Sequence, residues 1–342
     1  NTGKLTWKRL PEIKSGDFLP IRRDLELFPR REFPVRYKAV AHPRRRVISL
    51  PRTINSDLAL LLGYLVGDGS YDERKDGDVR LTNADRSLVR NFARILYKQF
   101  GLRPTLSRST AHKTAPTWYV ICKSFREWLC AAGLDHVTAR NKKVPDSILK
   151  SPKAVQSAFL RGLFDTDGSA SGNGTRLVLA TTSSLLAEQV RMMLLNFGII
   201  TARLHIKASD SWRVEMYGKN LRLFEQKIGF GLLAKARQLR RMVRRGDDGN
   251  GKTNVDFIPG ATQLWRELRQ TLRKRLGVTQ GRRGRGLFAK SFLAEGILLS
   301  RLALPSCQTN YRHLDELLTA IGHRWPWTRR LAAYRTLDAL RR

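Results

Sequence analysis

The sequence predicts an α+β fold made of two similar halves, and three observations support this prediction. The phrases LLGYLVGDGS and LRGLFDTDGS occur at residues 61–70 and 160–169 and share the pattern Gly-x-x-x-small-Asp-Gly-Ser. The same order of helix, hairpin, helix, hairpin and helix accompanies each phrase. With 42% hydrophobic residues, the chain can also form a substantial core. Two αββαββα subdomains are therefore expected.

The composition predicts a nucleic-acid partner. Lys and Arg number 64 against 29 Asp and Glu, which gives a formal net charge of +35 over 342 residues. Such an excess attracts polyanions. Neutralising several phosphates makes binding strongly salt-dependent. Cys122, Cys130 and Cys307 lack the spacing of a zinc site or a disulfide framework. These scattered cysteines favour a reducing interior, so we expect an intracellular protein, cytoplasmic or nucleoid-associated. No apolar run is long enough to span a membrane, so no membrane partner is expected.

Composition also divides the chain into four parts. Residues 1–53 are rich in Pro and contain short β-like runs, which predicts a small β-rich N-terminal element. The two repeats occupy residues 54–149 and 150–259. Residues 260–342 are Arg-rich and helical in pattern, with a flexible GRRGRG segment, and we expect this extension to make extra contacts with DNA.

In the first repeat, Ser56 is the predicted N-cap of a helix that ends near Gly69. A hairpin whose second arm is DGDVRLTN follows, and then a helix over residues 85–101 closed by Gly101. Two further strands, in RPTLSRS and PTWYVIC, and a helix over residues 123–133 complete this half.

The second repeat opens with Ser151 as a predicted cap and Pro152 at the first helical position. The strand GTRLVLAT, a helix over residues 183–198, a hairpin over 201–218 and a helix over 219–230 follow in the same order as before. An internal duplication is the simplest explanation.

Small residues four positions apart predict a close helix pair. Gly63 and Gly67 lie on one helix face, as do Gly162 and Thr166. A lone pair of this kind in a soluble helix is usually chance. Two copies, each followed by Asp-Gly-Ser at the same offset, instead favour an interface where two backbones approach closely.

Parallel packing of these helices would place Asp68 and Asp167 side by side. Two carboxylates ~4 Å apart repel by ~4 kcal/mol at an effective dielectric of ~20, and each also faces the negative end of its helix dipole. A divalent cation with oxygen ligands, above all Mg²⁺, would neutralise them. Metals held by a basic protein in this way are suited to phosphodiester hydrolysis.

The two phrases resemble the signature of the LAGLIDADG homing endonucleases, in their single-chain form with two motifs. The resemblance covers residues 54–259 and implies that the motif helices form the central interface of a monomeric pseudo-dimer. It also implies that Asp68 and Asp167 bind Mg²⁺, with Mn²⁺ or Ca²⁺ as other occupants, and that the carbonyls of Gly67 and Thr166 are further ligands. The implied activity is a staggered double-strand break in DNA with short 3′ overhangs.

Other segments resemble the intein-encoded branch of this family. RNKKVPDSILKSP is similar to a Lys-x-(Ile or Val)-Pro block, which implies an active-site role for Lys142, with Lys143 as the neighbour that can be confused with it. An isolated Lys-Lys pair is more often a solvated surface pair. Before Pro259 the matching place holds Asp256, with Lys252 as a weaker substitute. TWKRLPEIKSGDFLPIRR is similar to part of an intein splicing domain.

If the sheets form a saddle on double-stranded DNA, alternate strand residues face the duplex. Each candidate is as plausibly a solvated surface charge as a base or phosphate contact. The candidates are Arg80, Arg103, Arg108, Lys113, Arg176, Arg203, Lys207 and Arg213. The alternative function is a non-cleaving DNA-binding regulator or an RNA maturase on the same fold, but a pure binder has no need of two repelling acids.

Overall fold

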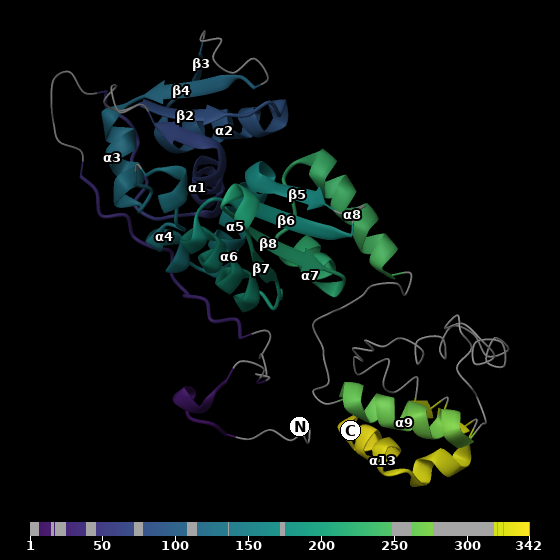
Figure 1. Cartoon of the computed structure of the whole chain (residues 1–342). Helices are drawn as coiled ribbons and strands as arrows, with labels where there is room; N and C mark the ends of the chain where they lie inside the picture. The colour runs from purple at the N-terminus through teal and green to yellow at the C-terminus, as the bar shows by residue number, and fades with distance from the viewer. Residues whose placement is uncertain are drawn as a thin grey trace. The chain divides into compact units, whose positions relative to one another are not determined.

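A computed structural model of the chain has two compact units. The larger, Arg22–Lys252, holds both repeats, and the smaller combines Asn1–Ile21 with Thr253–Arg342. Figure 1 shows the elements of each unit. The structure describes residues 7–14, 17, 25–38, 46–71, 78–107, 115–135, 137–171, 175–247, 261–275, 318–319, 321–323 and 325–341.

The first repeat follows the predicted order. Its elements are α1 (Ser56–Asp68), β1 (Gly69–Tyr71), β2 (Asp78–Thr82), α2 (Arg86–Phe100), β3 (Thr105–Leu106), β4 (Thr117–Ile121) and α3 (Lys123–Ala131). Gly101 ends α2 in a left-handed conformation with φ 68°, which confirms its predicted place as a C-terminal cap.

The second repeat has the same order and confirms the duplication. A connection containing a 3₁₀ turn (Ala139–Asn141) and α4 (Asp146–Leu149) leads into it. Its elements are α5 (Lys153–Asp167), β5 (Gly168–Ser171), β6 (Arg176–Thr181), α6 (Ser184–Asn196), β7 (Ala202–Ile206), β8 (Ser211–Tyr217) and α7 (Lys219–Lys227). A further helix, α8 (Leu233–Asp247), follows α7.

Both predicted N-caps are one residue out of place. The N-cap of α1 is Asn55, whose Oδ1 accepts a hydrogen bond from the Leu58 amide at 3.0 Å, so Ser56 is the first helical residue. The N-cap of α5 is Pro152. Ser151 is not the cap because its hydroxyl donates to the Ser147 carbonyl at 2.6 Å, at the end of α4.

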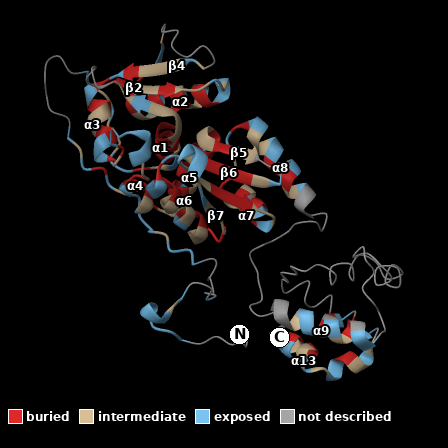
Figure 2. Ribbon diagram, in the orientation of Figure 1, coloured by how far each residue is buried: buried red, intermediate tan, exposed pale blue. Residues whose placement is uncertain are grey.

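Each repeat contributes one four-stranded antiparallel sheet, with strand orders β1-β2-β4-β3 and β5-β6-β8-β7. Val79, Leu81 and Val120 are buried on one side of the first sheet, and Leu177, Leu179, Val214 and Met216 are buried on one side of the second. Figure 2 shows buried segments, in red, on strands of both sheets. We call the opposite side of each sheet its outer face. Alternation along paired strands places on it Asp78, Arg80, Thr82, Thr117, Tyr119 and Ile121 in the first sheet, and Arg176, Val178, Ala180, Arg213, Glu215 and Tyr217 in the second.

The helices α1 and α5 pack backbone against backbone. A Cβ atom on Gly63 would lie 2.4 Å from the carbonyl oxygen of Phe159, and one on Gly162 would lie 2.5 Å from that of Leu60. Further along, Gly67 adjoins Thr166. Contacts advance in the same direction on both helices, so the pair is parallel, as predicted. The small residues therefore allow an approach that a methyl group would block.

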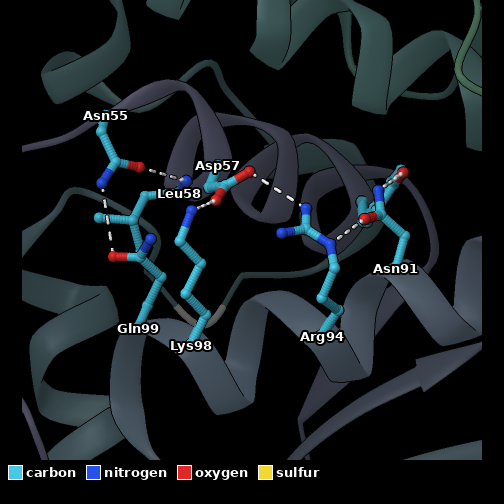
Figure 3. A network of polar contacts seen from close by, with 8 residues as sticks. Asn55, Asp57, Leu58, Asn91, Arg94, Lys98 and Gln99 are labelled. Atoms are coloured by element: carbon cyan, nitrogen blue, oxygen red, sulfur yellow. Dashed lines mark hydrogen bonds and ion pairs between the residues drawn. The ribbon is translucent and has the colours of Figure 1, made fainter.

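Polar contacts tie α1 to α2 along its length (Figure 3). Asp57, in the first turn of α1, pairs with Arg94 at 3.1 Å and with Lys98 at 2.7 Å. Two turns later, Asn91 donates to the hydroxyl of Tyr64 at 3.1 Å. Because a carboxylate near a helix N-terminus also interacts favourably with the helix dipole, Asp57 stabilises α1 in two ways.

The segment that precedes α1 contacts both repeats. Leu27 and Asn196 of α6 exchange hydrogen bonds of 2.8 and 3.0 Å, while the Tyr37 hydroxyl donates to Glu127 of α3 at 2.6 Å. In the described part of residues 1–53, regular structure consists of one 3₁₀ turn, Leu10–Glu12, and one isolated bridge between Pro34 and Thr53. The predicted β-rich character is not found in those residues.

The smaller unit has its own core. It contains α9 (Ala261–Arg275), a 3₁₀ turn (Pro326–Arg330) and α13 (Ala332–Arg341), with Leu268, Leu318 and Leu337 fully buried between them. The predicted GRRGRG segment lies outside the described residues. Within the described part of the chain, none of the helices combines the length and hydropathy needed to cross a membrane.

We expect Gly63→Ala to destabilise the protein by about 2 kcal/mol or more, because the new methyl group meets backbone that cannot rotate away. Gly101→Ala is the matched control, since no atom lies within 4 Å of its Cβ position and the left-handed φ alone costs about 1 kcal/mol. Urea unfolding followed by circular dichroism measures both. Equal losses for the two variants would contradict the close helix contact.

Candidate active site

The two motif helices end side by side, and each ends in an aspartate. Asp68 is the last residue of α1 and Asp167 is the last residue of α5. One residue earlier, a Cβ atom on Gly67 would lie 2.0 Å from Oγ1 of Thr166, so the two helix ends are in contact. The structure thus brings together the four residues that the sequence analysis assigned to a metal site.

The two acids interact electrostatically. Burial and then the negative charge of Asp68 raise the pKa of Asp167 to about 6, against the opposing effect of Lys142 and Lys235. The carboxylic acid form of Asp167 is therefore favoured well above its ordinary pKa of 3.8. A cation placed between the two carboxylates would relieve this repulsion.

A hydrogen bond orients Asp68, and its donor was not among the residues expected from the sequence. Asn83 Nδ2 donates to Asp68 Oδ2 at 2.6 Å, while Asn83 Oδ1 accepts from the Asp85 amide at 2.7 Å, which fixes the orientation of the side-chain amide. Thr181 occupies the matching place in the second sheet, where its hydroxyl accepts from the Ser183 amide. The two aspartates are thus held differently.

Lys142 reaches the end of α1, whereas its neighbour Lys143 does not. The Nζ of Lys142 donates to the Gly67 carbonyl at 2.7 Å. Burial lowers the pKa of Lys142, while the charges of Asp167 and Asp68 act in the opposite direction. Lys143 instead pairs with Asp135 at 3.7 Å. The geometry therefore favours Lys142 over Lys143 for the active-site role.

A second lysine, Lys235 in α8, occupies the equivalent place at the end of α5. Its Nζ lies within hydrogen-bonding distance of four carbonyls, those of Phe164 (3.1 Å), Asp165 (2.6 Å), Thr166 (3.2 Å) and Gly168 (2.7 Å). Burial lowers the pKa of Lys235, opposed by Asp165, Asp167 and Asp68.

Residue spacing contains no signal for Lys235. It is one cation among many in LAKARQLRRMVRRG, so nothing in the pattern distinguishes it from a phosphate-binding face. The expected second lysine was near Asp256 and Lys252, and both of these residues lie outside the described part of the chain.

Asp165 positions the start of α8, and with it Lys235. Its carboxylate is 1% exposed and accepts hydrogen bonds from the amides of Gly231 and Leu232 at 3.0 and 3.2 Å. These amides immediately precede α8, where a carboxylate is favoured by the helix dipole. Burial raises the pKa of Asp165 to about 6, although its backbone hydrogen bonds lower it. Val66 holds the same motif position in α1, so this support exists on one side only.

Comparison with known proteins agrees with this geometry. A family model described as a LAGLIDADG-like domain matches residues 55–130 and again residues 154–229. The chain contains two LAGLIDADG-like domains. The predicted double-motif organisation is confirmed, and the α+β fold with two four-stranded sheets agrees with it.

Curated relatives match most of this chain but only part of their own length. The chain is 29% identical over 281 residues to the Replication factor C small subunit of Methanocaldococcus jannaschii, which covers 80% of this chain and 13% of that protein. For a DNA gyrase chain of Mycobacterium kansasii the identity is 28%, with 77% and 44% covered. For the replicative DNA helicase DnaB of Rhodothermus marinus it is 26%, with 77% and 27% covered. The chain therefore spans less than half of each of these relatives.

Solved structures with detectable similarity include homing endonuclease I-DmoI in complex with DNA and Mn, at 16% identity and a TM-score of 0.40, with 52% of this chain and 97% of that chain covered. Homing endonuclease I-WcaI bound to its DNA recognition sequence is 17% identical, with a TM-score of 0.42 and coverage of 55% and 88%. The N-terminal LAGLIDADG domain of DUF199/WhiA is 15% identical, with a TM-score of 0.39 and coverage of 55% and 87%.

The donor atoms where the two LAGLIDADG-like domains meet suit a hard divalent cation. Asp68 and Asp167 would supply carboxylate oxygens, and Gly67 and Thr166 would supply carbonyl oxygens, which are the ligands that Mg²⁺ prefers. Each carbonyl also accepts a hydrogen bond from a lysine Nζ, that of Lys142 or Lys235. The described residues contain no cluster of three or more His, Cys, Asp or Glu side chains, so within them the donor set does not resemble a zinc site.

The predicted DNA-contacting residues separate into groups. Arg80, Arg176 and Arg213 lie on the outer faces of the two sheets. Lys207 is in the turn between β7 and β8, and Arg103 precedes β3 with its guanidinium 4.9 Å from the Tyr97 ring centre. Arg108 and Lys113 lie outside the described residues. Among the described candidates, these three arginines are therefore the ones that lie on the outer face of a sheet.

Arg203 does not point outward, contrary to the sequence-based expectation. Its register partner is the fully buried Val214, so it lies on the helix-covered side of the second sheet. There it pairs with Glu188 of α6 at 3.2 Å and stacks over Trp212, 3.9 Å from the ring centre. The prediction failed because the alternation of a strand does not indicate which of its two faces is covered.

We expect Asp167→Asn to stabilise the metal-free protein at pH 7.5. The folded pKa of about 6 lies above the ordinary 3.8, so the charged carboxylate costs at most about 3 kcal/mol. This cost is fully present above pH 6 and disappears as the pH falls toward 3.8, because the folded state then binds the proton more tightly than the unfolded state. The advantage of the variant should therefore vanish near pH 4.

Thermal unfolding in EDTA at both pH values measures this difference. Asp146→Asn, at an exposed acid of α4 that pairs with Lys150, is the control and should change stability little at either pH. An Asp167→Asn variant less stable than the wild type at pH 7.5 would contradict the close approach of the two acids.

Proposed function

We propose that this protein is a site-specific DNA endonuclease that depends on Mg²⁺ and makes a staggered double-strand break at a long recognition site. The observation that carries the proposal is the pairing of Asp68 with Asp167 at two abutting helix ends, flanked by Lys142 and Lys235. Two like charges held together cost stability, and a protein that only bound DNA would gain nothing from them.

The residues of the chain divide the work of phosphodiester hydrolysis. Asp68 and Asp167 would hold the metal, with the Gly67 and Thr166 carbonyls as further ligands. When bound, the metal supplies a positive charge that favours attack on the phosphate. Asn83 fixes the orientation of Asp68. Lys142 and Lys235 place ammonium groups at the two helix ends, where they can stabilise negative charge that develops on the phosphate oxygens and on the leaving oxygen.

Double-stranded DNA is the proposed substrate because of the charge of the chain and the form of its sheets. A net charge of +35 favours a polyanion. The outer faces of both sheets carry arginines. Each sheet also begins beside the acids, because β1 and β5 start directly after Asp68 and Asp167. We propose that one chain, as a pseudo-dimer, contacts both halves of the target.

The curated relatives support an intein-encoded origin. The matched segment lies within proteins of different names, a replication factor, a gyrase and a helicase, and makes up a minor part of each. A module that recurs inside proteins of unrelated activity is best explained as an insertion with a function of its own. We therefore propose that the activity of the chain is separate from that of any such host.

Cleavage tests the proposal directly. We expect a plasmid that carries the uninterrupted host sequence to be linearised in Mg²⁺ and left intact in EDTA. Asp68→Asn and Asp167→Asn should abolish the linear product while DNA binding persists, whereas Asp146→Asn should cleave as the wild type does. Tight binding without cleavage under any divalent metal would instead support a regulator or a maturase.

Lysine variants test the proposed division of roles. Lys142→Met and Lys235→Met should each lower the single-turnover cleavage rate about 10²- to 10³-fold, the usual effect of losing one group that stabilises developing charge. Lys143→Met is the matched control, because its side chain pairs with Asp135, and should change the rate little. Equal losses at Lys142 and Lys143 would contradict the assignment.

A further inference from the structure

The outer face of each sheet combines an arginine with a buried acid. The Asp78 side chain is 2% exposed beside Arg80, whose side chain is 33% exposed. The Glu215 side chain is 1% exposed beside Arg176, which is 31% exposed. In both halves the acid lies beneath the surface and the guanidinium reaches it.

In the first half, one carboxylate oxygen holds one edge of the guanidinium. Asp78 Oδ2 accepts from Arg80 Nε at 2.9 Å and from Nη2 at 2.7 Å. Such a contact fixes the plane of the planar guanidinium as well as its position. The other oxygen, Asp78 Oδ1, is buried and has no hydrogen-bond partner among the residues that the structure describes.

In the second half, the acid comes from the neighbouring strand. Glu215 Oε2 accepts from Arg176 Nη1 at 3.2 Å and also from the Tyr217 hydroxyl. Glu215 Oε1 is buried, and the described part of the chain offers it no hydrogen-bond partner. The same combination of a half-satisfied buried carboxylate and a surface arginine therefore occurs on both sheets.

Stability does not explain these acids. A buried carboxylate with one unpaired oxygen is costly, and apolar residues of similar volume often serve a fold as well or better. The acids also lie on the faces proposed to meet a polyanion, where negative charge weakens binding. What each acid does provide is a buried acceptor that holds an arginine at that surface, through two hydrogen bonds for Arg80 and one for Arg176.

We propose that Asp78 and Glu215 are positioning residues for base recognition, each orienting one arginine to read a guanine in the major groove. This inference rests on the proposed function of site-specific DNA binding. Arginine recognises guanine by two parallel hydrogen bonds to O6 and N7. Because the gain from such a bidentate contact depends on geometry, holding the guanidinium in place sharpens the preference for one base.

The register of the two sheets places Arg80 and Arg176 at different distances from the ends of their motif helices. Gly69 pairs with Leu81 and Gly168 pairs with Leu179, so Asp78 and Arg176 occupy matching places, and Arg80 matches Val178. Arg176 is therefore two residues farther than Arg80 from the end of its motif helix, or about 7 Å along the strand. The base pair read through Arg80 should lie nearer the centre of the target.

Selection from randomised DNA duplexes tests the proposal with the full chain in EDTA, so that cleavage does not interfere. The wild type should enrich a sequence with a guanine at one position in each half. Asp78→Asn should weaken the preference at the inner position by about 5- to 150-fold, and Glu215→Gln should do the same at the outer position. Preferences elsewhere should remain.

Four variants distinguish a positioning role of the acids from a purely structural one. Asp78→Glu should restore part of the preference at the same position. Asp78→Asn combined with Arg80→Gln should be no worse there than Arg80→Gln alone, because the acid acts through the arginine. Glu188→Gln removes an acid that pairs with Arg191 and Arg203 on the helix-covered side, and should leave every preference unchanged.

The outcomes are distinguishable. If the wild type enriches a sequence and both acid variants enrich the same one with undiminished preference, the positioning role is wrong while the proposed function stands. A uniform loss of base preference at all positions would also overturn the positioning role, since that is the effect of a lost phosphate contact or of partial unfolding. If the wild type enriches no sequence, site-specific recognition and this inference fail together.

Discussion

The contact between α1 and α5 is the constraint on which the rest of the structure depends. Gly63 and Gly162 let the two backbones touch, and the contact continues to Gly67 and Thr166 at the helix ends. Because each helix ends in an aspartate and continues directly into a strand, one packing interaction fixes both the spacing of the acids and the position of two sheets. A small change in helix separation would alter the site and the nucleic-acid surface together.

Charge compensation follows from that contact. Parallel packing joins two helix C-termini, so carbonyl dipoles and carboxylates concentrate negative potential at one place. Lys142 and Lys235 reach this place from outside the motif helices, one from the link between the repeats and the other from α8. Each keeps its ammonium group near the carbonyls of one helix. The site is symmetric in its charges, yet Asn83 and Asp165 support its two sides differently.

Much of the fold could be predicted because its signals are local. Hydrophobic periodicity indicated the order of helices and strands, and Gly101 marked a helix end through its left-handed backbone. The N-caps shifted by one residue, since Asn55 can cap as well as Ser56 and only the backbone geometry selects between them. Arg203 was misplaced because alternation defines two faces of a strand without saying which one the helices cover.

The sequence by itself determined the duplication, the helix pair and the two acids, because these depend on residue types at fixed spacings along the chain. Only the tertiary structure separated Lys142 from Lys143 and revealed Lys235, Asn83 and Asp165. Asp78 and Glu215 likewise became visible only once their strands were paired. These roles depend on contacts between segments that are far apart in the chain. Residue spacing does not indicate which side chains will be brought together by burial and strand register.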